Sequence, residues 1–112
     1  MPEPTAESDI AGFLEMIAAE RGAAQNTVEA YRRDLEHFAS FLDRHGLDLR
    51  SAAAADLAHF ARELAAARLA PPSRARRVSA VRQLYKFLSA EGLVAEDPAR
   101  RLSGPRQPRS LP

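Results

Sequence analysis

The segment from Ser73 to Ala90 holds the side chains whose types and spacing suggest chemistry, because it has five basic residues and no acidic one. A helix that is merely solvated usually carries both charge signs. Arginine and lysine bind phosphates, arginine can bond bidentately to guanine, and glutamine can bond in the same way to adenine. At about 100° per residue, one helical face would gather Arg76, Ser79, Arg82, Gln83 and Lys86. This face is consistent with contact to double-stranded DNA and equally with a solubilising surface.

Two further groups complete the candidate DNA-binding set. The first consists of three more polar residues near the start of the same segment: Ser73, Arg74 and Arg77. The second lies at the start of another predicted helix, where free N–H groups can bind a phosphate; its members are Asn26, Thr27, Arg32 and Arg33. Helix capping explains Asn26 and Thr27 equally well, and neighbouring acidic residues dilute the charge, so this second group is the weaker signal.

The residue types argue against catalysis by this chain. It has no cysteine, which excludes disulfides, thiolate nucleophiles and cysteine zinc sites. Its histidines, His37, His45 and His59, lie on separate predicted segments or far apart, and the His59–Glu63 spacing supplies too few ligands for a metal. No serine has a Gly-x-Ser-x-Gly context, and there is no glycine-rich phosphate loop. We therefore predict no catalytic residue, no metal and no cofactor.

The elements that must position these residues are four segments in which apolar residues recur at helical intervals. They cover about 6–21, 27–45, 54–69 and 74–90. Their boundary signals are N-caps at Asn26 and Ser73 and stops at Gly22, Gly46, Pro71-Pro72 and Gly92. Asp97-Pro98-Ala99 is typical of a cap, a first-turn proline and a short final helical turn. The sequence therefore predicts an all-α chain, a compact four- to five-helix bundle.

The charge distribution divides the chain. Residues 1–20 carry five acidic side chains and no basic one, whereas residues 71–112 carry nine basic side chains against three acidic ones. A basic C-terminal third suggests a polyanionic partner on one side of the molecule. The length of 112 residues suits one domain, predicted over 1–102, followed by a basic, proline-rich linker over 103–112 that would lead to an absent domain. No secretory signal or membrane span is evident, so we expect a cytoplasmic protein.

Three stretches, in this order, resemble parts of the N-terminal core-binding domain of tyrosine site-specific recombinases, in the phage-integrase superfamily. The second helix of that domain is similar to Thr27-x-x-x-Tyr31-x-x-Asp34-Leu35-x-x-Phe38-x-x-Phe41-Leu42. Its fourth helix is similar to Ser73-x-x-Arg76-x-x-Ser79-Ala80-Val81-Arg82-x-Leu84-Tyr85-x-Phe87-Leu88. The segment before its catalytic domain is similar to Asp97-Pro98-Ala99 with Pro105-Arg106 and Leu111-Pro112. The resemblance covers about residues 8–112 and is greatest to the XerC/XerD branch; Arg77 departs from it, at a position that is often apolar.

The resemblance implies a SAM-like bundle that forms half of a C-shaped clamp around duplex DNA, with its second and fourth helices near the major groove. By position, Asn26, Thr27, Tyr31 and Arg32 would lie near the DNA backbone. Phosphate and base contacts would come from Ser73, Arg76, Ser79, Arg82 and Lys86. The intact enzymes cut a strand with a tyrosine, form a 3′-phosphotyrosyl link and rejoin the strand, with catalytic groups in a second domain that this chain lacks. Tyr85 corresponds to a core aromatic residue of the family, not to that nucleophile.

The function expected from this resemblance is DNA binding within a Xer recombinase that resolves chromosome or plasmid dimers at the nucleoid. Sister protomers in a tetrameric synaptic complex would be its partners, and we expect the acidic residues Glu7, Asp9 and Glu15 to meet a neighbouring protomer. A phage or transposon integrase is the first alternative, and the short stretch before the first predicted helix favours the simpler Xer layout. The second alternative is a helical protein-interaction module, which would expose an apolar patch.

Overall fold

The computed structural model describes residues 5–102, and over that range the chain is helical with no strand. Four helices follow one another: α1 (Ala6–Glu20), α2 (Gln25–Arg44), α3 (Ala54–Ala66) and α4 (Pro71–Ala90). The all-α prediction is confirmed. The linker predicted over 103–112 lies outside the described residues.

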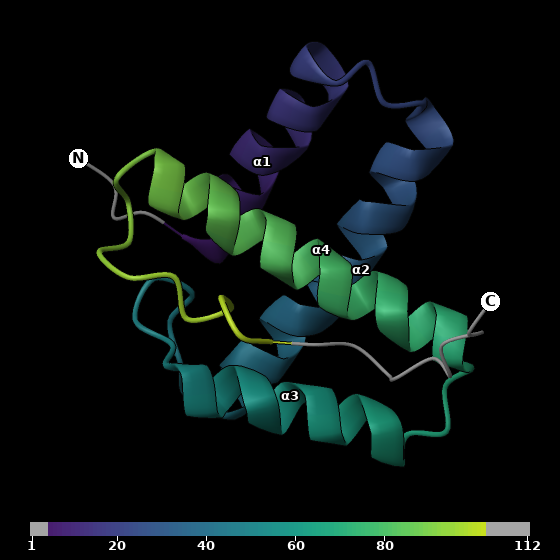
Figure 1. Ribbon diagram of the computed structural model, residues 1–112, viewed down its shortest axis with the longest axis vertical. Helices are drawn as coiled ribbons and strands as arrows, with labels where there is room; N and C mark the ends of the chain where they lie inside the picture. The colour runs from purple at the N-terminus through teal and green to yellow at the C-terminus, as the bar shows by residue number, and fades with distance from the viewer. Residues whose placement is uncertain (1–4, 103–112) are drawn as a thin grey trace, which may run out of the picture.

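Helix α4 organises the bundle. It lies across both α1 and α2, which pack against each other, and it also contacts α3 (Figure 1). After α4 the chain turns back, and the segment up to Leu102 returns alongside α3, whose residues share a shallow hollow with Pro98 and Arg101. One side of α4 therefore packs into the core. Its outer side borders the segment that returns after the helix.

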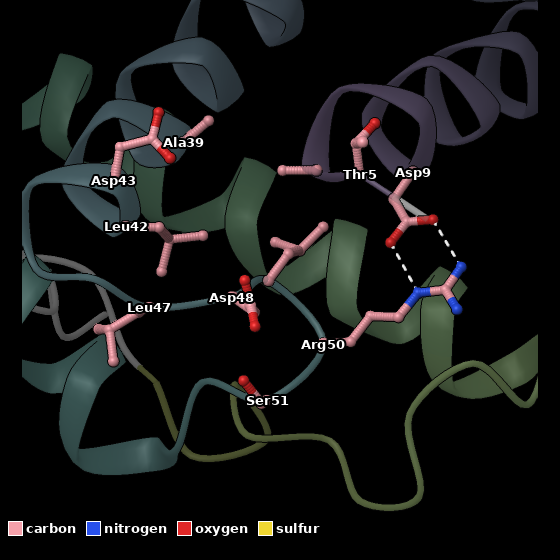
Figure 2. A pocket seen from close by; sticks show the side chains of 11 residues that line it. Thr5, Asp9, Ala39, Leu42, Asp43, Leu47, Asp48, Arg50 and Ser51 are labelled. Atoms are coloured by element: carbon pink, nitrogen blue, oxygen red, sulfur yellow. Dashed lines mark hydrogen bonds and ion pairs between the residues drawn. The ribbon is translucent and has the colours of Figure 1, made fainter. Parts of the chain in front are cut away.

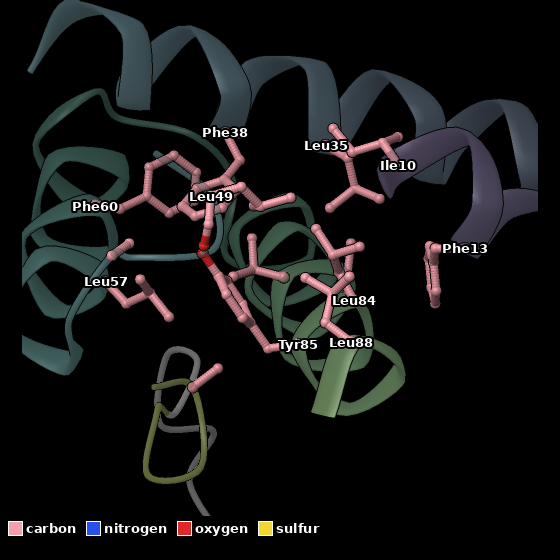
Figure 3. Packing of buried hydrophobic residues seen from close by; sticks show 14 of the residues in the cluster. Ile10, Phe13, Leu35, Phe38, Leu49, Leu57, Phe60, Leu84, Tyr85 and Leu88 are labelled. Atoms are coloured by element: carbon pink, nitrogen blue, oxygen red, sulfur yellow. Dashed lines mark hydrogen bonds between the residues drawn. The ribbon is translucent and has the colours of Figure 1, made fainter. Parts of the chain in front are cut away.

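The predicted apolar stripes meet in one core. Each helix contributes fully buried side chains, and the largest are Phe13, Phe38, Phe41, Phe60 and Tyr85. Tyr85 packs edge-to-face against Phe38, with ring centroids 6.1 Å apart, and its hydroxyl donates to the Leu49 carbonyl at 2.6 Å (Figure 3). Burial raises the pKa of the Tyr85 phenol above its ordinary value, which keeps the hydroxyl protonated as a donor. The predicted role of Tyr85 as a core residue is confirmed.

The predicted N-caps of α2 and α4 are wrong. Helix α2 begins at Gln25 with Ala24 as its cap residue, and Asn26 and Thr27 lie inside the first turn with exposed side chains. Helix α4 begins at Pro71, so Pro71-Pro72 starts this helix instead of ending α3, which stops at Ala66. Proline suits the first helical positions because their N–H groups have no partner inside the helix.

The helix stops follow the predicted glycines. Gly22, Gly46 and Gly92 have φ angles of 60°, 64° and 72°, the left-handed conformation that glycine adopts without a steric penalty. Arg68 takes the same conformation after α3, with φ of 59°. The predicted cap at Asp97 is also confirmed, because its Oδ1 accepts from the Ala99 N–H at 2.8 Å, and the chain then makes a single turn over 98–101.

Among the described helices, none is both long enough and apolar enough to cross a membrane.

Candidate nucleic-acid interface

The outer side of α4 and the turn after Asp97 enclose a shallow hollow of about 390 Å³. Its lining comprises Ser79, Arg82, Gln83, Lys86, Asp97, Ala99 and Arg100. The turn is held here because Ala99 is buried in the core and Asp97 caps it. This anchoring places Arg100 beside α4, although Arg100 is fourteen positions after Lys86 in the sequence. The structure thus brings together four of the predicted DNA-binding residues and adds Arg100, which the sequence reasoning did not select.

The hollow is electropositive. Arg82, Lys86 and Arg100 are exposed and have no ion-pair partner within residues 5–102. Asp97 is the one acidic residue of the lining, and one of its oxygens already accepts the Ala99 N–H. Three exposed cations against one carboxylate in the lining attract a polyanion, because charge-assisted bonds to phosphate oxygens replace part of the hydration that the phosphate loses.

Arg76 and Arg77 have a structural task that the sequence reasoning missed. Asp34 of α2 is fully buried, and Arg76 Nε and Nη2 donate to its two carboxylate oxygens at 2.8 and 3.0 Å. Arg77 Nε donates to Asp34 Oδ1 at 3.3 Å. A buried carboxylate needs such partners, so these bonds fix α4 against α2. The side chain of Arg76 is still 47% exposed, so its predicted contact with DNA stays a prediction.

Gln83 belongs to a polar network between three helices. Arg21 Nη1 donates to Gln83 Oε1 at 2.7 Å, and Gln83 Nε2 donates to Tyr31 Oη and Ser79 Oγ, both at 3.1 Å. Tyr31, which the sequence places in an apolar stripe, is half-buried with its hydroxyl in this network.

The other predicted contacts lie outside the hollow. Asn26 and Thr27 are exposed on the first turn of α2, and neither has a capping bond. Arg32 pairs loosely with Glu29 at 3.5 Å, and Arg33 Nε donates to the Glu29 carbonyl at the same distance. Capping was the competing explanation for Asn26 and Thr27, and it no longer applies.

At the start of α4, Ser73 and Arg74 are partly buried, and Arg74 Nε is buried without a hydrogen-bond partner in the described chain. The DNA role of these two residues stays a prediction.

The histidines are closer together than their sequence positions suggest. The rings of His45 and His59 lie 4.9 Å apart, and both pack on Phe41, so the prediction that they are separate is wrong. Glu63 bonds bidentately to Arg44 at 3.0 and 3.1 Å, and these bonds lower the pKa of Glu63. Within residues 5–102 no group of three or more histidine, cysteine or acidic side chains could hold a metal.

His37 lies on α2 near the same end of the molecule, with its ring 5.9 Å from that of Phe60. Burial lowers its pKa, and the nearby cations Arg77 and Arg44 lower it further. The nearby carboxylates of Glu63 and Asp34 oppose this shift without reversing its direction.

The acidic surface predicted on α1 is smaller than expected. Asp9 is buried, with 7% of its surface exposed, and Arg50 Nε and Nη2 each donate to its carboxylate at 2.9 Å (Figure 2). This pair ties α1 to the loop before α3, so Asp9 does not belong to an exposed interface. Glu7 and Glu15 remain exposed on α1.

Comparison with known proteins agrees with this fold. Residues 10–92 match the family model described as the phage integrase N-terminal SAM-like domain. This match covers most of the chain, and the chain therefore belongs to that family.

Among curated relatives, the chain is 50% identical over 103 residues to the tyrosine recombinase XerD of Rhizobium meliloti (strain 1021). It is 48% identical over 100 residues to the tyrosine recombinase XerD of Caulobacter vibrioides and 47% identical over 103 residues to that of Brucella suis. These alignments cover 92%, 89% and 92% of the chain. The chain spans about a third of the length of each relative, 33% in all three cases.

Replacement of the buried carboxylate tests the link between α2 and α4. We expect Asp34→Ala to lower the free energy of unfolding by about 2–4 kcal/mol, because it leaves the partly buried Arg77 without a counter-charge. Arg76→Ala should cost about 2–3 kcal/mol, since it leaves the fully buried Asp34 carboxylate with only the 3.3 Å bond from Arg77. Urea unfolding followed by circular dichroism measures both.

The matched control is Asp43→Ala, which removes an exposed carboxylate from the same helix and should change the stability by less than about 0.5 kcal/mol. Equal losses for Asp34→Ala and Asp43→Ala would show that the α2–α4 pair does not hold the bundle.

Proposed function

We propose that this chain is the DNA-binding N-terminal domain of a Xer-type tyrosine recombinase. The observation that carries the proposal is the hollow beside α4, in which Arg82, Lys86 and Arg100 are exposed and form no ion pair in the described chain. Family membership and the named XerD relatives support it independently. We infer that the three cations bind phosphates of duplex DNA and that Ser79 contributes its hydroxyl.

In this account the domain binds and orients DNA and performs no chemistry itself. Phosphate contacts release condensed counterions, so the affinity should be modest and should fall steeply with salt. The rest of the intact enzyme would supply the nucleophilic tyrosine, the 3′-phosphotyrosyl intermediate and strand rejoining. We place the intact protein in the cytoplasm with the nucleoid, acting in the resolution of chromosome or plasmid dimers, because its substrate would be chromosomal or plasmid DNA.

Two alternatives receive less support. A protein-interaction module would need an exposed apolar patch, and in the described range Leu93 is the one exposed large hydrophobic residue, at 38%. A phage or transposon integrase would share the fold, and the family model alone is equally compatible with it. The curated relatives that carry the XerD name favour the Xer assignment.

Removal of the three cations tests the DNA-binding surface. We expect the variant Arg82→Ala/Lys86→Ala/Arg100→Ala to bind a duplex recombination half-site at least tenfold more weakly at low salt. Its salt dependence should fall by about two to three units in the slope of log K against log salt, because each lost phosphate contact removes about 0.9. Fluorescence anisotropy with labelled duplex at several salt concentrations gives both quantities.

The control Arg44→Ala/Arg62→Ala/Arg68→Ala removes the same net charge from exposed arginines outside the hollow. If both triple variants lose the same affinity, the protein binds DNA through its net charge alone and the hollow is not the interface.

We also propose that Glu7 and Glu15 on α1 meet a neighbouring protomer when recombinase subunits assemble on DNA, since neither residue lines the basic hollow. In an intact Xer recombinase that carries this domain, Glu7→Lys/Glu15→Lys should slow the formation of higher-order complexes in gel shifts while single-protomer binding persists. The matched reversal Glu91→Lys/Glu96→Lys, at exposed positions after α4, should not. Normal assembly by the α1 variant would contradict this proposal.

A further inference from the structure

The amide of Gln83 is bonded to side chains from three parts of the chain. Its oxygen accepts from Arg21 at the end of α1, and its nitrogen donates to Tyr31 of α2 and to Ser79 of α4, one turn earlier. Because a guanidinium is only a donor, Arg21 fixes which end of the amide is oxygen. Both N–H groups of the amide are then directed at hydroxyl oxygens.

This arrangement leaves the Gln83 amide no free hydrogen with which to read a base. Bidentate recognition of adenine requires one amide N–H and the amide oxygen at the same time. Gln83 is also only partly exposed. Reading a base would therefore cost the bond from Arg21 and at least one of the two bonds to hydroxyl groups. The contact with adenine that the helical wheel suggested does not fit this geometry.

The same arrangement leaves hydrogen-bond donors without a partner in the described chain. The Tyr31 and Ser79 hydroxyls each accept a hydrogen from Gln83, so their own hydrogens are available to another acceptor. Arg21 is exposed and keeps its remaining N–H groups, and it has no ion-pair partner within the described residues. These N–H and O–H donors lie together with one positive charge, and none of them is bonded to a carboxylate in the described chain. Such a group of donors suits an anion with several acceptor oxygens.

We propose that Arg21, Tyr31 and Ser79 form a binding site for one phosphodiester group of the DNA backbone and that Gln83 is its positioning residue. The inference rests on the proposed DNA-binding function. It adds Arg21, which lies fifty-eight positions before Ser79 in the sequence and was outside the candidate set. Ser79 and Gln83 also line the basic hollow, so the site adjoins Arg82 and Lys86 on the same helix.

The test compares the 112-residue chain with Arg21→Ala, Gln83→Met and the double variant by fluorescence anisotropy. Two duplexes of equal length are used, a recombination half-site and a scrambled sequence. Each single variant should lose about three- to tenfold in affinity for both duplexes by the same factor, since a phosphate carries no sequence information. Arg21→Ala should also lower the salt slope by about one. The double variant should bind more tightly than the product of the two losses predicts, because Gln83 acts partly through Arg21.

Three other outcomes would contradict these expectations, and each has a different meaning. If Gln83→Met abolishes the preference for the half-site while Arg21→Ala changes nothing, Gln83 reads a base and the inference is overturned. The control Arg62→Ala removes an exposed arginine of α3; an equal loss in Arg62→Ala and Arg21→Ala would reduce the effect of Arg21 to net charge and also overturn it. If the unsubstituted chain binds neither duplex, the proposed function itself fails.

Discussion

The buried carboxylate of Asp34 is the constraint on which the rest of the molecule depends. A carboxylate without exposed surface is stable only with strong donors around it, and Arg76 and Arg77 supply three N–H bonds from α4. Two consecutive arginines can reach the same carboxylate only if α4 has one particular position along α2 and one particular rotation about its own axis. That rotation directs Val81, Leu84, Tyr85 and Leu88 into the core, and it directs Arg82 and Lys86 to solvent. The contact with Asp34 thus gives a structural reason for the arginine at position 77, where the resemblance led us to expect an apolar residue.

Other buried polar groups are likewise satisfied by bonds between separate elements of the fold. Asp9 and Arg50 join α1 to the loop before α3, and the Tyr85 hydroxyl satisfies the Leu49 carbonyl in that same loop. Ala99 anchors the chain after α4 to the core. These contacts hold the helices and loops together without using the cations of the basic hollow. Those cations are therefore available to a ligand. The proposed division is therefore between arginines that hold the fold, such as Arg50 and Arg77, and cations that bind DNA.

The helices and the core were predictable because burial imposes the helical repeat of apolar residues on the sequence itself. The basic outer face of α4 was predictable for the same reason, since it lies opposite the stripe. The starts of α2 and α4 were harder to predict. Their cap residues, Ala24 and Ala70, make no side-chain capping bond, so the residue type at these positions gives no signal. Pairings across the bundle, such as Asp34 with Arg76, join residues about forty positions apart and depend on packing geometry. Arg100 and Arg21 were missed for this reason.

The central claim is that DNA meets the side of the domain formed by α4 and the turn after Asp97. Backbone and arginine side-chain chemical shifts of the chain, measured by NMR during titration with a duplex half-site, test it most directly. We expect the largest changes at Arg21, Ser79, Arg82, Lys86 and Arg100, with little change at the Asp9–Arg50 pair that joins α1 to the loop before α3. Changes concentrated on α1 and the outer side of α2, with the hollow unaffected, would contradict it.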